Sequence, residues 1–150
     1  MNLDFKELLL AFNAQNVEYL IVGAHALAAH GHVRATKDLD LWVRPDILNA
    51  RKVIQALSDF GAPLSDLTAD DLSRKKTIFQ IGLPPVRIDI ITNIDGVEFE
   101  EAWPDRLEMS FGDVPAFVIS RHHLITNKKT SARLQDLADV QQLEAIEDRS

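Results

Sequence analysis

The stretch YLIVGAHALAAHGHVRATKDLDLWV, residues Tyr19–Val43, contains the signals that decide the fold. Its first four residues are apolar and favour β structure, which predicts a buried strand. At Gly23 the pattern changes to the alanine-rich segment AHALAAH, which favours a short helix, and Gly31 lies where helices often end on a left-handed residue. The last residues alternate again, so the stretch predicts a strand, a glycine turn, a helix and a second strand.

Two aspartates interrupt the second of these strands. Since successive side chains of a strand point to opposite faces, Asp38 and Asp40 share one face. Leu39, Leu41 and Val43 share the other face and are expected in the core. Burying an unpaired carboxylate is costly or forces it to take up a proton. The two carboxylates are therefore expected either to face water on a half-exposed sheet or to hold a cation.

A third aspartate repeats the pattern in the segment VRIDII. Asp89 lies between Ile88 and Ile90, which point to the opposite face of that strand. Carboxylate oxygens suit hard cations such as Mg²⁺, which are usually held by few carboxylates together with substrate phosphates. Three acids in two otherwise apolar strands favour a metal site over an ordinary solvent-facing surface.

Gly23 suggests a second element of such a site. A strand that enters a glycine turn and then a helix presents free backbone N–H groups and the positive end of the helix dipole to an anion. Phosphate at Gly23 and a metal ion at the aspartates would together describe a bound nucleoside triphosphate. The simpler interpretation is that the glycine only makes a tight turn.

The rest of the chain continues this mixture of elements. Pro45 suits the first turn of a helix that Gly61 ends. A proline turn at Pro84 and Pro85 is expected to join two paired strands, and the acidic segment 93–103 has a loop-like composition. Further helices are predicted at residues 5–12, 120–129 and 133–147, and further strands at residues 77–83, 86–92, 107–111 and 114–119. The prediction is an α+β fold, with a mixed sheet and flanking helices.

Composition narrows the class of protein. A chain of 150 residues is long enough for one domain with its own core, predicted to span residues 1–150, with the C-terminal helices packed on it. The chain has no cysteine, which excludes disulfides and thiolate metal sites. A net charge of −7 argues against a broad nucleic-acid surface. Neither a leader peptide nor a membrane span is predicted, so we expect a cytoplasmic location.

The quoted residues resemble the nucleotidyltransferase superfamily of polymerase-beta-like fold. Its pattern is a strand, a Gly-Gly or Gly-Ser at the head of a helix, an Asp-x-Asp strand and a later strand with a third acid. Gly23 and Ala24, the DLD of residues 38–40 and Asp89 match these positions. Ala24 departs from the pattern, because it cannot offer the hydroxyl of a serine.

A second segment narrows the resemblance. Together with residues 22–43, the segment LITNKKTSARLQDLADVQQLE, residues 124–144, is similar to small bacterial nucleotidyltransferases related to the AbiEii abortive-infection toxins. The likeness runs from Tyr19 to Leu143. It implies a toxin–antitoxin context in which a partner chain is expected.

The resemblance implies a metal-dependent transfer of a nucleoside monophosphate from a triphosphate to a hydroxyl. Asp38, Asp40 and Asp89 would bind two Mg²⁺ ions, or Mn²⁺ in their place, and act as the catalytic residues. Asp89 would also accept the hydroxyl proton. The acceptor is left open between a small molecule, an RNA end and a protein. The residues expected to contact the nucleotide are Gly23, Ala24, Arg34, Thr36 and Lys128.

One alternative function accompanies this interpretation. The chain could be a catalytically silent binding module, such as an antitoxin or a partner subunit, which the alanine at position 24 would favour.

Trp42 lies on the aspartate face, where a packing role is preferred over stacking on a base. Asp136 and Asp139 are expected to pair with Arg133 or to orient Lys128, with a structural role preferred.

Overall fold

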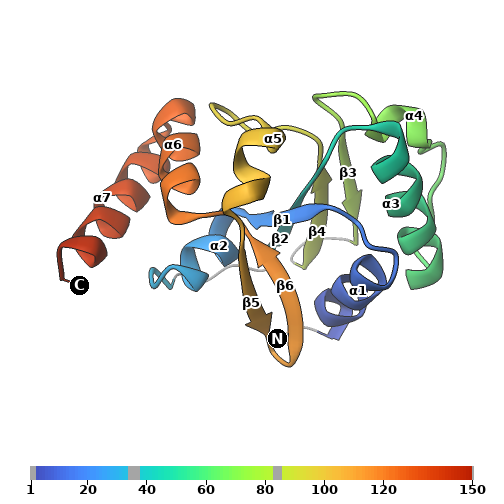
Figure 1. The fold of residues 1–150 in the computed structure, drawn as a ribbon, viewed down its shortest axis with the longest axis horizontal. Helices are drawn as coiled ribbons and strands as arrows, with labels where there is room; N and C mark the ends of the chain where they lie inside the picture. Colours follow the sequence, from blue (N-terminus) through green and yellow to red (C-terminus); the bar gives the residue numbers. More distant parts are fainter. Residues whose placement is uncertain (1–2, 34–37, 83–85, 150) are drawn as a thin grey trace.

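The computed structural model describes residues 3–33, 38–82 and 86–149 (Figure 1). The helices are α1 (Leu3–Ala14), α2 (Gly23–Ala29), α3 (Ile47–Phe60), α4 (Ala69–Leu72), α5 (Phe99–Ala102), the 3₁₀ helix η1 (Trp103–Asp105), α6 (Arg121–Ser131) and α7 (Leu134–Arg149). The strands are β1 (Tyr19–Val22), β2 (Asp38–Val43), β3 (Ile78–Ile81), β4 (Arg87–Ile91), β5 (Leu107–Phe111) and β6 (Val114–Val118). None of the helices in these ranges is both long and apolar enough to cross a bilayer.

The strands form one six-stranded sheet in the order β3-β4-β2-β1-β6-β5. The strand β1 runs antiparallel to β2 and parallel to β6, while β2 runs parallel to β4. Both edge strands, β3 and β5, are antiparallel to their neighbours. The predicted α+β fold with a mixed sheet is therefore confirmed. Its topology makes the two aspartate-bearing strands direct neighbours.

Helices flank the sheet on two sides (Figure 1). Helix α1 packs against α3, which also contacts α4. On the opposite side of the view, α6 and α7 form a helix pair beside α2. This arrangement places the C-terminal pair next to the end of β1, where Gly23 begins α2.

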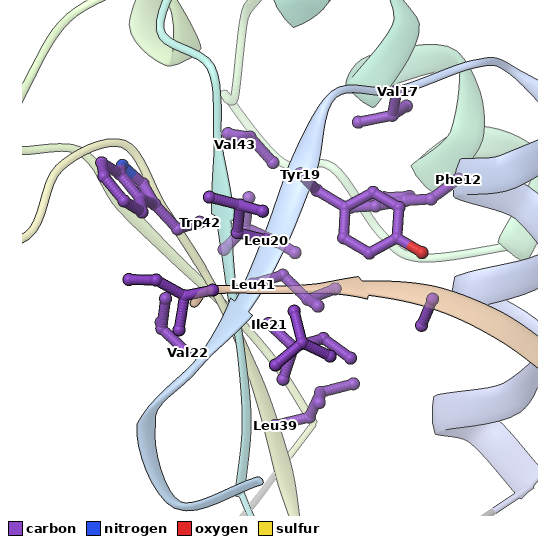
Figure 2. Packing of buried hydrophobic residues seen from close by; sticks show 14 of the residues in the cluster. Phe12, Val17, Tyr19, Leu20, Ile21, Val22, Leu39, Leu41, Trp42 and Val43 are labelled. Atoms are coloured by element: carbon purple, nitrogen blue, oxygen red, sulfur yellow. The ribbon is translucent and has the colours of Figure 1, made fainter. Parts of the chain in front are cut away.

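The core confirms the face assignment made from the sequence. Leu39, Leu41 and Val43 are fully buried. Figure 2 shows Leu39 and Leu41 beside Ile21 of β1. Burial of such side chains is the main favourable contribution to folding, at about 25 cal/mol per Å² of apolar surface.

Trp42 lies on the face of Asp38 and Asp40 but belongs to the packed interior. Its side chain is 1% exposed. Its ring and the Phe99 ring are nearly perpendicular, with the centroids 5.1 Å apart. The indole is covered by this contact, so the preferred packing role is confirmed.

One helix boundary differs from the prediction. Pro45 lies before helix α3 and not in its first turn, because the side chain of Asp46 caps the helix by accepting a hydrogen bond from the backbone N–H of Asn49 at 2.7 Å. Gly61 ends the same helix in the left-handed conformation, as predicted.

The segment 93–103 is not only a loop. It contains α5 and the start of η1, where Phe99 and Ala102 are buried. The signal was present as a capping box, in which Glu98 and Glu101 satisfy each other's backbone N–H groups. The pairing of β3 with β4 is confirmed, whereas the turn predicted at Pro84 and Pro85 lies outside the described residues.

Candidate active site

The register of β2 and β4 brings three carboxylates together. In this parallel pair, Asp40 lies opposite Asp89 and Asp38 lies opposite Arg87. Paired residues of neighbouring strands point to the same face, so all four side chains project from one side of the sheet. We call Asp38, Asp40 and Asp89 the acidic cluster.

Arg87 is a member of this site that the sequence analysis did not identify. Its Nη2 lies 3.5 Å from Oδ2 of Asp38 and 3.4 Å from Oδ2 of Asp89. Its Nε lies 3.1 Å from Oδ1 of Asp89. The alternation in VRIDII could have found it, because Arg87 is two residues from Asp89 and shares its face.

The environment changes the acidity of two of these carboxyls. Burial raises the pKa of Asp40 to about 6, and the negative charges of Asp89 and Asp38 add to the effect. Burial also raises the pKa of Asp89, although the charge of Arg87 opposes this shift. Both carboxyls therefore hold a proton more readily than an exposed aspartate does.

Gly23 is required by the position of Asp40. Val22 lies opposite Asp40 in the β1–β2 ladder, and Gly23 follows with a positive φ of 69°. A Cβ at Gly23 would overlap Oδ2 of Asp40. The glycine therefore allows both the left-handed backbone and the close approach of the carboxylate.

Substituting Gly23 with alanine tests this contact, with Gly61→Ala as the matched control. Gly61 also has a positive φ, of 92°, but a Cβ there would meet no described atom within 4 Å. Both variants are expected to lose about 1–2 kcal/mol of unfolding free energy to backbone strain. Gly23→Ala should lose clearly more, because Asp40 must also move. Urea denaturation of both variants measures the difference, and equal losses would contradict the contact.

A cavity of about 400 Å³ lies beside the acidic cluster. Gly23 and Asp40 line it from the sheet, and Lys128 lines it from α6. Its remaining lining residues are Val22, Ile91, Ile94, Asp95, Asn127, Ser131, Arg133 and Asp136. The tertiary structure thus brings the C-terminal segment of the predicted site to the same space as the first segment.

Lys128 is buried and held by two carboxylates of α7. Its Nζ lies 3.4 Å from Oδ1 of Asp136 and 3.1 Å from Oδ2 of Asp139. Arg133 also contacts Asp136, with Nε 2.8 Å from Oδ2. Both predicted pairings, with Arg133 and with Lys128, are therefore present.

The surroundings of Asp136 favour its ionised form. Burial alone would raise its pKa, but hydrogen bonds from Arg133 and Ser131 and the charge of Lys128 together lower the pKa to about 2. The carboxylate stays ionised at neutral pH and fixes the end of Lys128 at the cavity wall.

The structure describes only some of the residues that the sequence predicts to contact the nucleotide. Gly23 and Lys128 line the cavity, whereas Ala24 is buried directly after Gly23, so only its backbone could serve a ligand. Arg34 and Thr36 lie outside the described residues. The nucleotide-binding role of these residues stays a prediction.

The donor chemistry of the acidic cluster fits a hard cation. The cluster offers carboxylate oxygens from adjacent strands, and Oδ1 of Asp89 is buried without a hydrogen-bond partner among the described residues. Among the residues that the structure describes, no group of three or more His, Asp or Glu side chains is arranged to hold a metal ion. Arg87 lies among the carboxylates in this arrangement. The metal-binding role of the cluster stays a prediction.

Comparisons with known proteins bear on the family and the fold of this chain. The profile of a family described as nucleotidyltransferase of unknown function (DUF6036) matches residues 1–149. No curated protein matches the chain.

Solved structures share the fold. The antibiotic-resistance factor ANT(2″)-Ia matches with a TM-score of 0.63 and 15% identity over 93% of this chain and 80% of that one. The lincosamide antibiotic adenylyltransferase LnuA, bound to lincomycin, matches with a TM-score of 0.60 and 17% identity over 97% of this chain and 98% of that one. A second matching structure of ANT(2″)-Ia holds adenylyl-2″-tobramycin. At these identities the likeness establishes the fold.

Proposed function

This chain belongs to the nucleotidyltransferase family DUF6036, and from that premise we propose that it transfers a nucleoside monophosphate from a triphosphate to a hydroxyl group, with release of pyrophosphate. The observation that carries the proposal is the meeting of Asp40, Gly23 and Lys128 around one cavity. A triphosphate needs carboxylates for its metal ions and positive charge for its phosphates, and these residue types face each other there.

The acidic cluster is the proposed metal site. Two Mg²⁺ ions held by Asp38, Asp40 and Asp89, or Mn²⁺ in their place, would bind the triphosphate and lower the pKa of the attacking hydroxyl. Asp89 is also the proposed general base, a role that the resemblance to nucleotidyltransferases implies for the third acid. The proton of the acceptor hydroxyl moves to this carboxylate.

The bond changes balance with these roles. The acceptor oxygen forms a bond to the α-phosphorus, and the bond from that phosphorus to the bridging oxygen of the β-phosphate breaks. Negative charge then builds on the pyrophosphate. Lys128 is proposed to offset this charge from the cavity wall, together with the backbone N–H groups of Gly23 and Ala24. The predicted roles of Arg34 and Thr36 are side-chain contacts to the same phosphates.

The fold neighbours suggest which substrates to test first. LnuA is named as a lincosamide antibiotic adenylyltransferase, and one structure of ANT(2″)-Ia is a complex with adenylyl-2″-tobramycin. We therefore propose ATP as the donor and a small hydroxylated molecule as the acceptor, ahead of an RNA end or a protein. The relation to AbiEii-type toxins, with a partner chain, stays a prediction from the sequence.

Incubation of the protein with each α-labelled nucleoside triphosphate and Mg²⁺ tests the function. The acceptors are lincosamides, aminoglycosides and, separately, a cell extract. Label is expected to move from one triphosphate to an acceptor with one pyrophosphate released per transfer, and EDTA should stop the reaction. If no acceptor is labelled, and calorimetry finds no magnesium-dependent nucleotide binding, the chain is instead the silent binding module.

A further inference from the structure

Arg87 holds the carboxylates of the acidic cluster without the geometry of an optimised ion pair. Its Nη2 donates hydrogen bonds to Asp38 and Asp89 at 3.5 and 3.4 Å, longer than the typical distance of about 2.9 Å. The Nε of Arg87 and Oδ1 of Asp89, although 3.1 Å apart, are both buried without a hydrogen-bond partner among the described residues. The charges are close, but the donors are poorly directed.

A second arginine in the same chain shows what directed pairing looks like. Arg133 donates from Nε to Oδ2 of Asp136 at 2.8 Å and from Nη2 to Oδ1 at 3.4 Å. This is the bidentate fork that arginine forms with carboxylates. The single guanidinium of Arg87 is instead divided between carboxylates of two strands, and one buried oxygen of Asp89 is left with unused acceptor capacity.

We propose that Arg87 is a built-in counter-ion of the acidic cluster, which neutralises Asp38 and Asp89 until a divalent ion displaces it. The inference rests on the proposed function, since it takes the cluster to be the metal site. A guanidinium and a divalent cation repel each other and compete for the same oxygens, so both cannot be held at contact distance. The side chain of Arg87 is 30% exposed, which gives the displaced guanidinium a path to solvent.

The arrangement has a physical purpose in the metal-free protein. Three carboxylates on adjacent strands repel each other when all of them are charged. Arg87 lowers this repulsion, and it is fixed to the cluster because its Cα lies opposite that of Asp38. The cost is weaker metal binding, since each metal ion must first remove the guanidinium.

The inference is tested independently of turnover by measuring Mn²⁺ binding in the absence of nucleotide. Electron paramagnetic resonance detects the Mn²⁺ that remains free. Arg87→Met is expected to bind Mn²⁺ about tenfold more tightly than the wild type, because a competing charge is lost. Arg87→Lys keeps the charge and should stay close to the wild type. Arg44→Met is the matched control, since Arg44 is also partly buried and pairs with a carboxylate, Glu18.

The outcomes separate the inference from the proposed function. Equal or weaker Mn²⁺ binding by Arg87→Met, with clear binding by the wild type, overturns the counter-ion role alone. If neither protein binds Mn²⁺, the metal site itself fails and the inference falls with it. Should Arg87→Met not fold, the Nε–H NMR signal of Arg87 in the wild type decides. Mg²⁺ is expected to shift it to the position of a solvated arginine, and an unchanged signal overturns the inference.

Discussion

Asp40→Asn is expected to lower nucleotide transfer by a factor on the order of 10³ and, in the same protein, to raise stability at pH 8. The activity falls because an amide cannot replace a carboxylate as a metal ligand and charge stabiliser. The stability rises because the native fold holds Asp40 beside two other acids, partly out of water, where its negative charge is costly.

The sign of the pH dependence follows from the raised pKa. Asp40 has a pKa of about 6 in the folded protein and 3.8 as the ordinary value, so between these values the folded state binds the proton that the unfolded state loses. The stability of the wild type therefore falls as the pH rises through this window. Above about pH 7 the full penalty, on the order of 3 kcal/mol, is present, and Asp40→Asn removes it. Below about pH 3, where Asp40 is protonated in both states, the penalty is absent and the two proteins should be about equally stable.

Urea denaturation at several pH values, together with the transfer assay, measures both effects. Asp46→Asn is the control, since Asp46 caps α3 away from the site and asparagine is an equally good cap. It should change neither the activity nor the pH profile. An Asp40→Asn protein with wild-type turnover, or one that is less stable at pH 8, would contradict the proposed place of Asp40.

Lys128→Met is expected to cause the largest loss of stability, about 3–5 kcal/mol of unfolding free energy. Lys128 has a side chain only 6% exposed, and the carboxylates of Asp136 and Asp139 are 4% and 0% exposed. Removing the lysine leaves two buried negative charges facing each other. Arg133 still contacts Asp136, and His32 lies 3.4 Å from Asp139, so the compensation is partial.

The neighbouring lysine provides the control. Lys129 also lies on α6 and pairs with Glu144 of α7 at 3.1 Å, but both side chains are about half exposed. Lys129→Met should cost less than about 1 kcal/mol. Adding Asp139→Asn to Lys128→Met should recover part of the loss, because one of the unpaired charges is then removed. Equal effects of the two lysine substitutions in urea denaturation would contradict the buried network.

The same variants separate the structural role of Lys128 from its proposed role toward phosphate. If Lys128 only joins α6 to α7, the double variant should regain nucleotide affinity together with stability. If Lys128 also contacts the triphosphate, the KM for the nucleotide should stay raised even after stability is partly restored.

Local sequence patterns predicted much of the fold. The alternation of DLDLWV and RIDII fixed which residues would be buried, since side chains of a strand can only point to one face or the other. Burial of Leu39, Leu41 and Ile90 bears this out. Gly23 was identified as a turn between a strand and a helix, and the structure adds that its φ is positive and that the missing side chain makes room for Asp40.

Other features were not visible along the chain. The preference for a loop at residues 93–103 missed α5, because four residues are too short to show helical periodicity, and only the capping box signals it. Phe99, which packs against Trp42, lies between acidic residues in that segment, so the composition does not show that the segment is buried.

The sequence by itself determined that Asp38, Asp40 and Asp89 would lie on the opposite face from the leucines and isoleucines beside them, because an alternating pattern encodes the face of each side chain. Only the tertiary structure decided that β2 lies beside β4, that Arg87 is shared between their carboxylates, and that Lys128 reaches the same cavity from α6. The physical reason is that strand order, register and helix docking depend on contacts between residues far apart in the chain, which no local periodicity records.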